Sequence, residues 1–214
     1  MPVYPINLDL SGRYCACIGG GSVAARKVED LIQAGACVTI ISPVLTPALQ
    51  QLAQAKKIVH IAQQYQPGSI GAFFMVICAT NDKVVNQAAA EEARSKGALV
   101  NIADAPELCD FTVPAKIMRG DLLITVSTGG KSPALAKKLR LELESRYGPE
   151  YGTYLEWAGA VREQMKNSLK TSKARECFWQ QTLDDEVLSL LRQGRVKDAE
   201  EKIKYAIGST GLKS

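Results

Sequence analysis

The sequence predicts an α/β fold in which helices cover a parallel sheet, followed by a β-hairpin region and a small helical domain. Three observations lead to this prediction. Over roughly the first hundred residues, short apolar runs alternate with helical patterns, as in a parallel sheet. Two further strand-like runs then follow one another without a helix between them. From Pro149 onward the composition is helical to the end.

The composition is that of a folded globular protein. The chain has 214 residues, and 46% of them are hydrophobic, which is enough for a sizeable core. No apolar run approaches the ~20 residues of a membrane helix, and the amino terminus lacks the basic and apolar regions of a signal peptide, so we expect a cytoplasmic protein without a membrane partner. The net charge of +4 is spread among acidic residues with little aromatic interleaving, which does not favour nucleic acid. An acidic small molecule or an ordinary solvated surface explains it as well.

The first strand, Tyr14 to Ile18, ends at three glycines, and a helical pattern begins at once. Gly19 and Gly21 match the first two glycines of G-x-G-x-x-G/A, and Ala24 fills the small third position. The unpaired N–H groups of the helix that follows suit a pyrophosphate. This turn predicts a Rossmann-type dinucleotide site with Gly19 and Gly21 as cofactor-binding residues.

The helix that follows extends from about Ser22 to Ala34, and we expect it to turn Val23, Val28, Leu31 and Ile32 toward the sheet. The next strand covers Cys37 to Ile41. About 20 residues past the glycines, where an acidic residue usually contacts the adenosine ribose, the chain has Ser42 and Pro43. Ser42 can hydrogen-bond a ribose hydroxyl, and no arginine follows directly to receive a 2′-phosphate. NAD is therefore favoured over NADP.

The remaining elements of this region are a helix over about Thr46 to Ala55, strands Ile58 to Ile61 and Phe73 to Ala79, a helix over Lys83 to Lys96, and a fifth strand, Ala98 to Ile102. The most apolar strand ends at Thr80, Asn81 and Asp82. Because ligands bind at the carboxyl ends of parallel strands, Thr80 and Asn81 are candidate cofactor contacts. Helix capping explains such polar side chains equally well. The single histidine, His60, is interpreted as an edge or core residue without a catalytic part.

Asp104 follows the fifth strand, directly before Ala105 and Pro106. A carboxylate at this strand end would point into the crevice of a nicotinamide, where it suits a general base. An aspartate before a proline-bearing turn is also a routine loop cap. The spacing alone leaves both interpretations open.

The runs Phe111 to Met118 and Leu122 to Thr128 predict a hairpin. A glycine pair then precedes a helix that begins at Pro133 and has an apolar face of Leu135, Leu139 and Leu143. The loop resembles the end of a P-loop, but that motif needs a glycine where the chain has Thr125, so we reject it. A glycine pair that opens a helix still makes an anion pocket, here for a substrate carboxylate. The candidate substrate-binding residues are Ser127, Thr128, Gly129, Gly130 and Lys131.

Three predicted helices follow. Tyr154, Leu155, Trp157, Ala158 and Val161 mark the first, Val187 to Leu191 the second, and Val196 to Ile207 the third, with a turn near Lys170 to Ser172 and a disordered tail from Gly208. The six cysteines include no C-x-x-C pair and accompany one histidine. We therefore expect neither a disulfide scaffold nor a metal site, and we interpret Cys15 and Cys17 as core residues.

Three motifs together resemble those of the precorrin-2 dehydrogenases, a family that includes the amino-terminal module of sirohaem synthase and stand-alone dehydrogenase and ferrochelatase enzymes. They are Gly19 to Lys27, Asp104-Ala105-Pro106, and Val126 to Pro133, in the order and spacing of the family. The likeness covers about the first 150 residues, and the helical tail resembles that of the stand-alone forms. We accordingly divide the chain into an NAD-binding Rossmann domain over 1–110, a dimerisation region over 111–148, a helical domain over 149–207, and a tail over 208–214. The resemblance implies a dimer in which the segment Phe111 to Glu144 exchanges between subunits.

The resemblance also implies an activity, the NAD-dependent oxidation of precorrin-2 to sirohydrochlorin by a homodimer in tetrapyrrole biosynthesis. It makes Asp104 the catalytic residue, Ser22 and Val23 pyrophosphate contacts, and Pro43 with Val44 adenosine-side contacts. Where some members have a serine that can be phosphorylated, this chain has Thr128, so such regulation is not assumed.

Two alternatives stay open. Some members also insert ferrous iron, so the first alternative is a bifunctional enzyme that inserts ferrous or cobaltous ion into sirohydrochlorin. An ionised Asp104 would attract such an ion, although no cysteine and histidine cluster would hold it. The second is a non-catalytic NAD-sensing module, although the acidic residue that usually closes the second strand of such sensors is missing.

Overall fold

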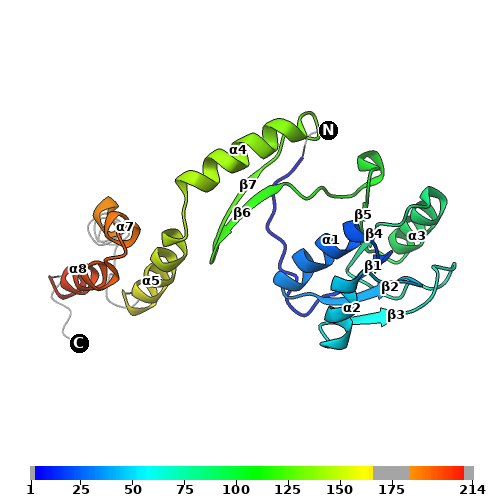
Figure 1. Cartoon of the computed structure of the whole chain (residues 1–214), viewed down its shortest axis with the longest axis horizontal. Helices are drawn as coiled ribbons and strands as arrows, with labels where there is room; N and C mark the ends of the chain where they lie inside the picture. Colours follow the sequence, from blue (N-terminus) through cyan, green and yellow to red (C-terminus); the bar gives the residue numbers. More distant parts are fainter. Residues whose placement is uncertain (1–2, 166–183, 210–214) are drawn as a thin grey trace. The chain divides into compact units, whose positions relative to one another are not determined.

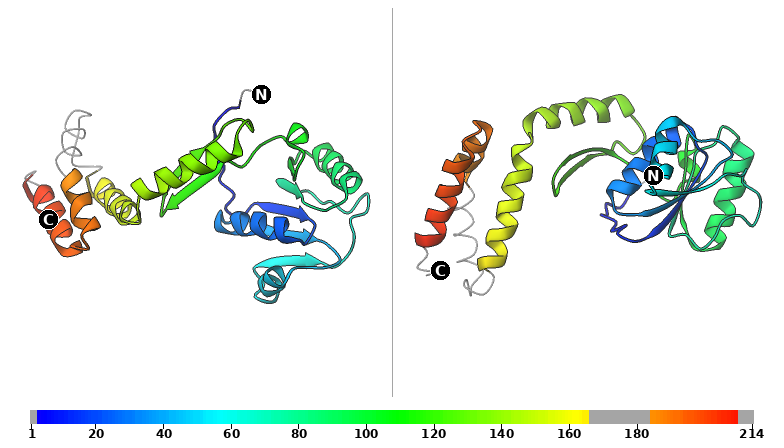
Figure 2. Two further views of the ribbon diagram at one scale, coloured as in Figure 1. Left: turned by 45° about the horizontal axis from the view of Figure 1, so that its top comes forward. Right: turned by 60° about the horizontal axis from the view of Figure 1, so that its bottom comes forward.

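The computed structural model describes residues 3–165 and 184–209 of the chain. Two compact units divide it, Met1–Val113 and Pro114–Ser214, and each is described by itself. Figures 1 and 2 show the elements of both units. The turn predicted near Lys170 and residues 210–214 of the predicted tail lie outside the described residues.

The first unit is built on a five-stranded sheet with the strand order β3-β2-β1-β4-β5. Its strands are β1 (Tyr14–Ile18), β2 (Cys37–Ile41), β3 (Ile58–Ile61), β4 (Met75–Cys78) and β5 (Leu99–Ile102). All neighbours pair in parallel, so the predicted fold class is confirmed. The order reverses between β1 and β4, and ligands of open α/β sheets bind at such a switch point, beyond the carboxyl ends of the strands.

Helices cover both faces of this sheet (Figure 1). α1 (Ser22–Gln33) and α2 (Pro47–Gln54) pack in one buried cluster, and α3 (Lys83–Ser95) packs in the other. Because successive strand residues point to opposite faces, β1 contributes Cys15 and Cys17 to the first cluster and its alternate residues to the second. The predicted core role of these two cysteines is confirmed.

The predicted sheet-facing position of Val23 is wrong, because its side chain is 39% exposed. Ala24, one residue further, takes the inward position and continues the buried stripe through Val28 and Leu31. These three residues are spaced at about one helical turn, and Val23 lies roughly 100° away from that stripe. Val28 and Leu31 are buried as predicted.

The second unit begins with an antiparallel hairpin of β6 (Ala115–Arg119) and β7 (Leu122–Val126), as the sequence predicts. Four helices are described after it: α4 (Pro133–Arg146), α5 (Glu150–Met165), α7 (Asp185–Arg192) and α8 (Val196–Ser209). α5, α7 and α8 share a small core of Val161, Val187, Leu191, Ala199 and Ile203. α8 ends two residues beyond the predicted Ile207.

α4 does not bury the whole of its predicted apolar face within the described chain. Ala136 is its buried residue, whereas Leu135 is 47% exposed and Leu139 and Leu143 are half-buried. The hairpin itself exposes Met118 and Leu123, which lie directly opposite one another.

Candidate functional site

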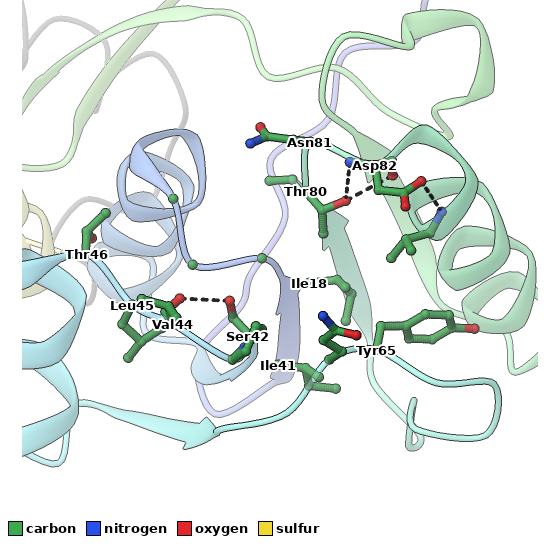
Figure 3. Close-up of a pocket in the computed structure, with 17 residues that line it drawn as sticks. Ile18, Ile41, Ser42, Val44, Leu45, Thr46, Tyr65, Thr80, Asn81 and Asp82 are labelled. Carbon is green, nitrogen blue, oxygen red and sulfur yellow. Dashed lines mark hydrogen bonds between the residues drawn. The ribbon is translucent and has the colours of Figure 1, made fainter.

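A pocket of about 660 Å³ lies at the carboxyl ends of β1, β2 and β4, around the switch point of the sheet (Figure 3). Segments that follow three strands form its walls. They are the glycine turn after β1, the segment from Ser42 to Thr46 after β2, and the segment from Ala79 to Asp82 after β4, with Gln64 and Tyr65 added from a loop.

The glycine turn fits tightly between neighbouring strand ends. Gly19 has a φ of +113°, which favours glycine, and a Cβ there would lie 2.5 Å from the Ala79 carbonyl oxygen. A Cβ on Gly20 would lie 2.1 Å from the Val44 carbonyl oxygen, whereas one on Gly21 would meet nothing within 4 Å. The fold therefore requires glycine at positions 19 and 20. Gly21 instead leaves open space beside the pocket.

Seven of the nine predicted cofactor-binding residues line this pocket: Gly19, Gly21, Ser42, Pro43, Val44, Thr80 and Asn81. Ser22 and Val23 do not line it and begin α1 directly after the turn. Leu45, Thr46, Gln64 and Tyr65 line it although no sequence motif indicated them. The structure thus brings most of the predicted residues together, and their contact with a cofactor stays a prediction.

The wall after β2 carries no charge. The Ser42 hydroxyl donates to the Val44 carbonyl at 2.8 Å, so its lone pairs remain to accept from a ligand. His60, on the edge strand β3, has its Nε2 2.9 Å from the Ser42 carbonyl oxygen.

The described residues that line the pocket include no lysine or arginine. Asp82 is the charged residue among them, and its carboxylate accepts from the amides of Val84 and Val85, which confirms the alternative of helix capping for this residue.

Glu92 of α3 holds the loop that carries Tyr65. Its carboxylate accepts hydrogen bonds from the Tyr65 hydroxyl at 2.7 Å and from the amides of Gly68 at 3.0 Å and Ile70 at 3.1 Å, and it pairs with Lys96 Nζ at 3.0 Å. Burial alone would raise the pKa of Glu92, but these contacts outweigh it and lower the pKa to about 2.

The variant Glu92→Gln should lower the free energy of unfolding by on the order of 2 kcal/mol at neutral pH. The folded-state pKa lies below the ordinary 4.5, so this contribution is present above that pH and is lost as the pH falls toward 2. Urea unfolding of both proteins at several pH values between neutrality and pH ~3 measures the difference. Glu91→Gln, an exposed neighbour on α3, serves as the control with a small effect. A pH-independent difference for Glu92→Gln would contradict the prediction.

Asp104 lies two residues beyond β5 and has a φ of +63°, a conformation that aspartate tolerates better than most residues. It is exposed and does not line the pocket. A short loop holds it in place, because the Cys109 thiol lies 3.3 Å from the carbonyl oxygens of both Ile102 and Ala105. The structure therefore presents this carboxylate on a braced loop at a strand end, and its contact with a substrate stays a prediction.

A second set of contacts anchors the far end of this loop. Asp110 accepts from the Val100 amide at 2.8 Å and from Arg94 Nε at 3.0 Å. The buried Asn101 donates to the Phe111 carbonyl at 2.9 Å. The loop that carries Asp104 is thus fastened to both β5 and α3.

The candidate substrate loop belongs to the second unit. Both of its glycines have positive φ, 60° and 79°. The Gly129 amide donates to the Ser127 hydroxyl at 3.2 Å, and the Ser132 amide donates to the Thr128 hydroxyl at 3.1 Å. The Lys131 amide donates to the Thr128 carbonyl at 3.1 Å, so three amides of the loop are already engaged by the loop itself. Lys131 is exposed, and the role of Ser127 to Lys131 in substrate binding stays a prediction.

Within residues 3–165 and 184–209, no group of three or more histidine, cysteine, aspartate or glutamate side chains is arranged to hold a metal ion. The cysteines in these ranges are free thiols. No helix in the same ranges is long and apolar enough to cross a membrane.

Family comparisons divide the chain into three consecutive parts. Residues 6–115 match the family described as putative NAD(P)-binding. Residues 119–146 match the central region of the sirohaem biosynthesis protein, and residues 150–207 match the dimerisation region of sirohaem synthase.

Individual relatives agree with these matches. The siroheme synthase of Methylobacillus flagellatus is 36% identical over 211 residues, which is 99% of this chain and 45% of that protein. The siroheme synthase of Methylococcus capsulatus is 39% identical over 200 residues, 94% of this chain and 42% of that protein. The chain thus spans about half the length of the curated relatives it matches. The solved structure of SirC, a precorrin-2 dehydrogenase, superposes with a TM-score of 0.78 at 25% identity, over 96% of this chain and 100% of that one.

Proposed function

This chain belongs to the putative NAD(P)-binding family, and we propose that it oxidises precorrin-2 to sirohydrochlorin with NAD as the hydride acceptor. The observation that carries the proposal is the match to a precorrin-2 dehydrogenase over the whole length of that protein. The pocket at the switch point of the sheet supports it, since dinucleotides bind there.

The residues of the pocket fit a dinucleotide. Open space beside Gly21 admits a pyrophosphate, which the amides at the start of α1, from Ser22 and Val23, would hold. Ser42, Pro43 and Val44 would contact the adenosine, and Thr80 and Asn81 would lie toward the nicotinamide. When bound, NAD supplies the acceptor for the hydride.

In the proposed mechanism Asp104 acts as the general base. Oxidation removes a hydride and a proton from the substrate, and the Asp104 carboxylate takes the proton. Its exposed position on a braced loop leaves it accessible to a bulky tetrapyrrole. Lys131 and the glycine pair before α4 would bind the carboxylates of the substrate.

NAD should bind about tenfold more tightly than NADP. The Ser42 hydroxyl proton is engaged with Val44, and the lining residues of the pocket include no cation for a 2′-phosphate. Calorimetric titration with both cofactors measures the ratio. Ser42→Arg should reverse the preference, whereas Ser42→Ala should weaken NAD binding only a few-fold. Equal binding of the two cofactors by the unmodified protein would count against the assignment.

We include a homodimer and a cytoplasmic location in the proposal. The dimer is supported by the match of residues 150–207 to a dimerisation region, and by the apolar side chains exposed on the hairpin and α4, among them Met118, Leu123 and Leu135. The division into residues 1–110, 111–148 and 149–207, with strand exchange in the middle region, belongs to the same proposal. The free thiols of the described cysteines fit a reducing compartment.

The test is to offer the purified protein precorrin-2 and NAD and to follow NADH and sirohydrochlorin by absorbance, with and without ferrous or cobaltous ion. Formation of both products supports the dehydrogenase. NAD binding without turnover would favour the sensing module instead. Metal-dependent consumption of sirohydrochlorin, faster than the spontaneous reaction, would add the chelatase activity.

A further inference from the structure

Asn86 is a polar side chain that α3 buries behind the pocket wall. It is 3% exposed, and the other buried residues of this helix are the alanines Ala89, Ala90 and Ala93. A buried amide costs free energy unless its donors and acceptor are satisfied, so an apolar residue would serve the core better. The hydrogen bonds of Asn86 must therefore explain why a polar residue occupies this buried position.

All of the described side-chain hydrogen bonds of Asn86 go to one residue, Thr80. Asn86 Oδ1 accepts from the Thr80 amide at 3.1 Å and from the Thr80 hydroxyl at 2.8 Å, and Asn86 Nδ2 donates to the Thr80 carbonyl at 2.9 Å. One backbone donor and one backbone acceptor fix the orientation of the amide, because exchanging its oxygen and nitrogen would break both bonds. The backbone and the hydroxyl of Thr80 are thus held at once.

Thr80 lines the pocket directly after β4, against the glycine turn (Figure 3). A Cβ on Gly19 would lie 3.1 Å from the Thr80 nitrogen, so these two segments are in close contact. In the strand order, β2 and β4 flank β1 on opposite sides. A dinucleotide whose pyrophosphate rests on the turn after β1 therefore places one nucleoside toward β2 and the other toward β4.

We infer that Asn86 is a positioning residue for the nicotinamide half of the cofactor, because it fixes Thr80 in the pocket wall after β4. The inference rests on the proposed function only in taking NAD as the ligand. The adenosine half would meet the wall after β2, which Asn86 does not contact. Asn86 should therefore affect the two halves of the cofactor unequally, whereas a purely structural role would affect them alike.

The test compares NAD with AMP, which contains the adenosine half alone. Asn86→Asp keeps the oxygen that accepts from Thr80 and, in its ionised form, replaces the donor by a second acceptor oxygen facing the Thr80 carbonyl, so that carbonyl must move away; the titrations are therefore run at alkaline pH, where the ionised form is favoured. We expect the affinity for NAD to fall about tenfold and the affinity for AMP to change less than about twofold, by calorimetry on the full chain. Equal losses for both ligands, or no loss for NAD, would overturn the inference.

Asn101→Asp is the matched control, since Asn101, within β5, is also a buried asparagine and donates to a backbone carbonyl outside the pocket. It should lower the unfolding temperature without changing the ratio of NAD to AMP affinity. If Asn86→Asp does not fold, Thr80→Val and Thr80→Ser replace it: the valine variant should lose NAD affinity selectively and the serine variant should retain it. Oxidation of precorrin-2 by the unmodified protein is assayed separately, so that failure of the proposed function is distinguished from failure of this inference.

Discussion

Replacing Asp104 by asparagine should lower the turnover of precorrin-2 by about a hundredfold or more, while NAD binds with unchanged affinity. A general base contributes rate by taking a proton in the transition state, and the amide cannot do so. Asparagine has nearly the same size and also tolerates the positive φ of this position, so the loop should keep its conformation. Asp104 does not line the pocket, which is why cofactor binding should be spared.

Steady-state NADH formation and a calorimetric titration with NAD measure the two quantities. Glu107→Gln is the matched control, because it removes another exposed carboxylate from the same loop and should leave turnover within about twofold. Turnover of Asp104→Asn close to that of the unmodified protein would exclude Asp104 as the base. A joint loss of turnover and NAD affinity would indicate that the loop had changed shape.

Substitutions at two glycines of the turn after β1 should have different effects, one on cofactor binding and the other on stability. Gly21→Ala should fold normally but bind NAD about a hundredfold more weakly, since its Cβ would meet no protein atom within 4 Å yet would occupy the space where the pyrophosphate approaches the backbone. The φ of Gly21 is −80°, which alanine adopts without strain. Gly20→Ala should instead destabilise the protein by roughly 1 to 3 kcal/mol, because the Val44 carbonyl oxygen 2.1 Å from the new Cβ must move.

Thermal unfolding and NAD titration of the two variants test this separation. Gly159→Ala, in the interior of α5 with no atom near the new Cβ, is the control and should stabilise the helix slightly without affecting NAD. If Gly21→Ala bound NAD as well as the unmodified protein, the pyrophosphate would not lie on this turn.

Much of the first unit can be predicted from the sequence because buried parallel strands appear as short apolar runs between turn residues. β1, β2 and β3 have the predicted bounds, and Asp82 caps α3 as one of the two interpretations proposed. The pocket could be anticipated for the same reason, since its walls follow from strand ends in a known order.

Other parts depend on contacts that leave no local pattern. Tyr65 meets Glu92 across 27 residues, and Gly20 is constrained by Val44, a carbonyl on another loop. Gly20 occupies the second position of G-x-G-x-x-G/A, which the motif leaves unspecified. The run of three glycines was the only sequence feature that pointed to a constraint on Gly20. The periodicity of α4 shows that Leu135 belongs to an apolar stripe, but it cannot show what covers the stripe. The brace from Cys109 to the Asp104 loop likewise arises from tertiary packing.

The parallel pairing of β1 with β4 also determines when the pocket can exist. Cys15 of β1 is opposite Met75 of β4, so 60 residues of chain must close before the two strands meet. The segments that follow β1 and β4 each form part of the pocket wall. A partly folded chain in which these strands are not yet paired therefore has no dinucleotide site. NAD should therefore bind the folded protein and not partly folded chains. We expect it to lower the rate of unfolding and to leave the rate of folding unchanged.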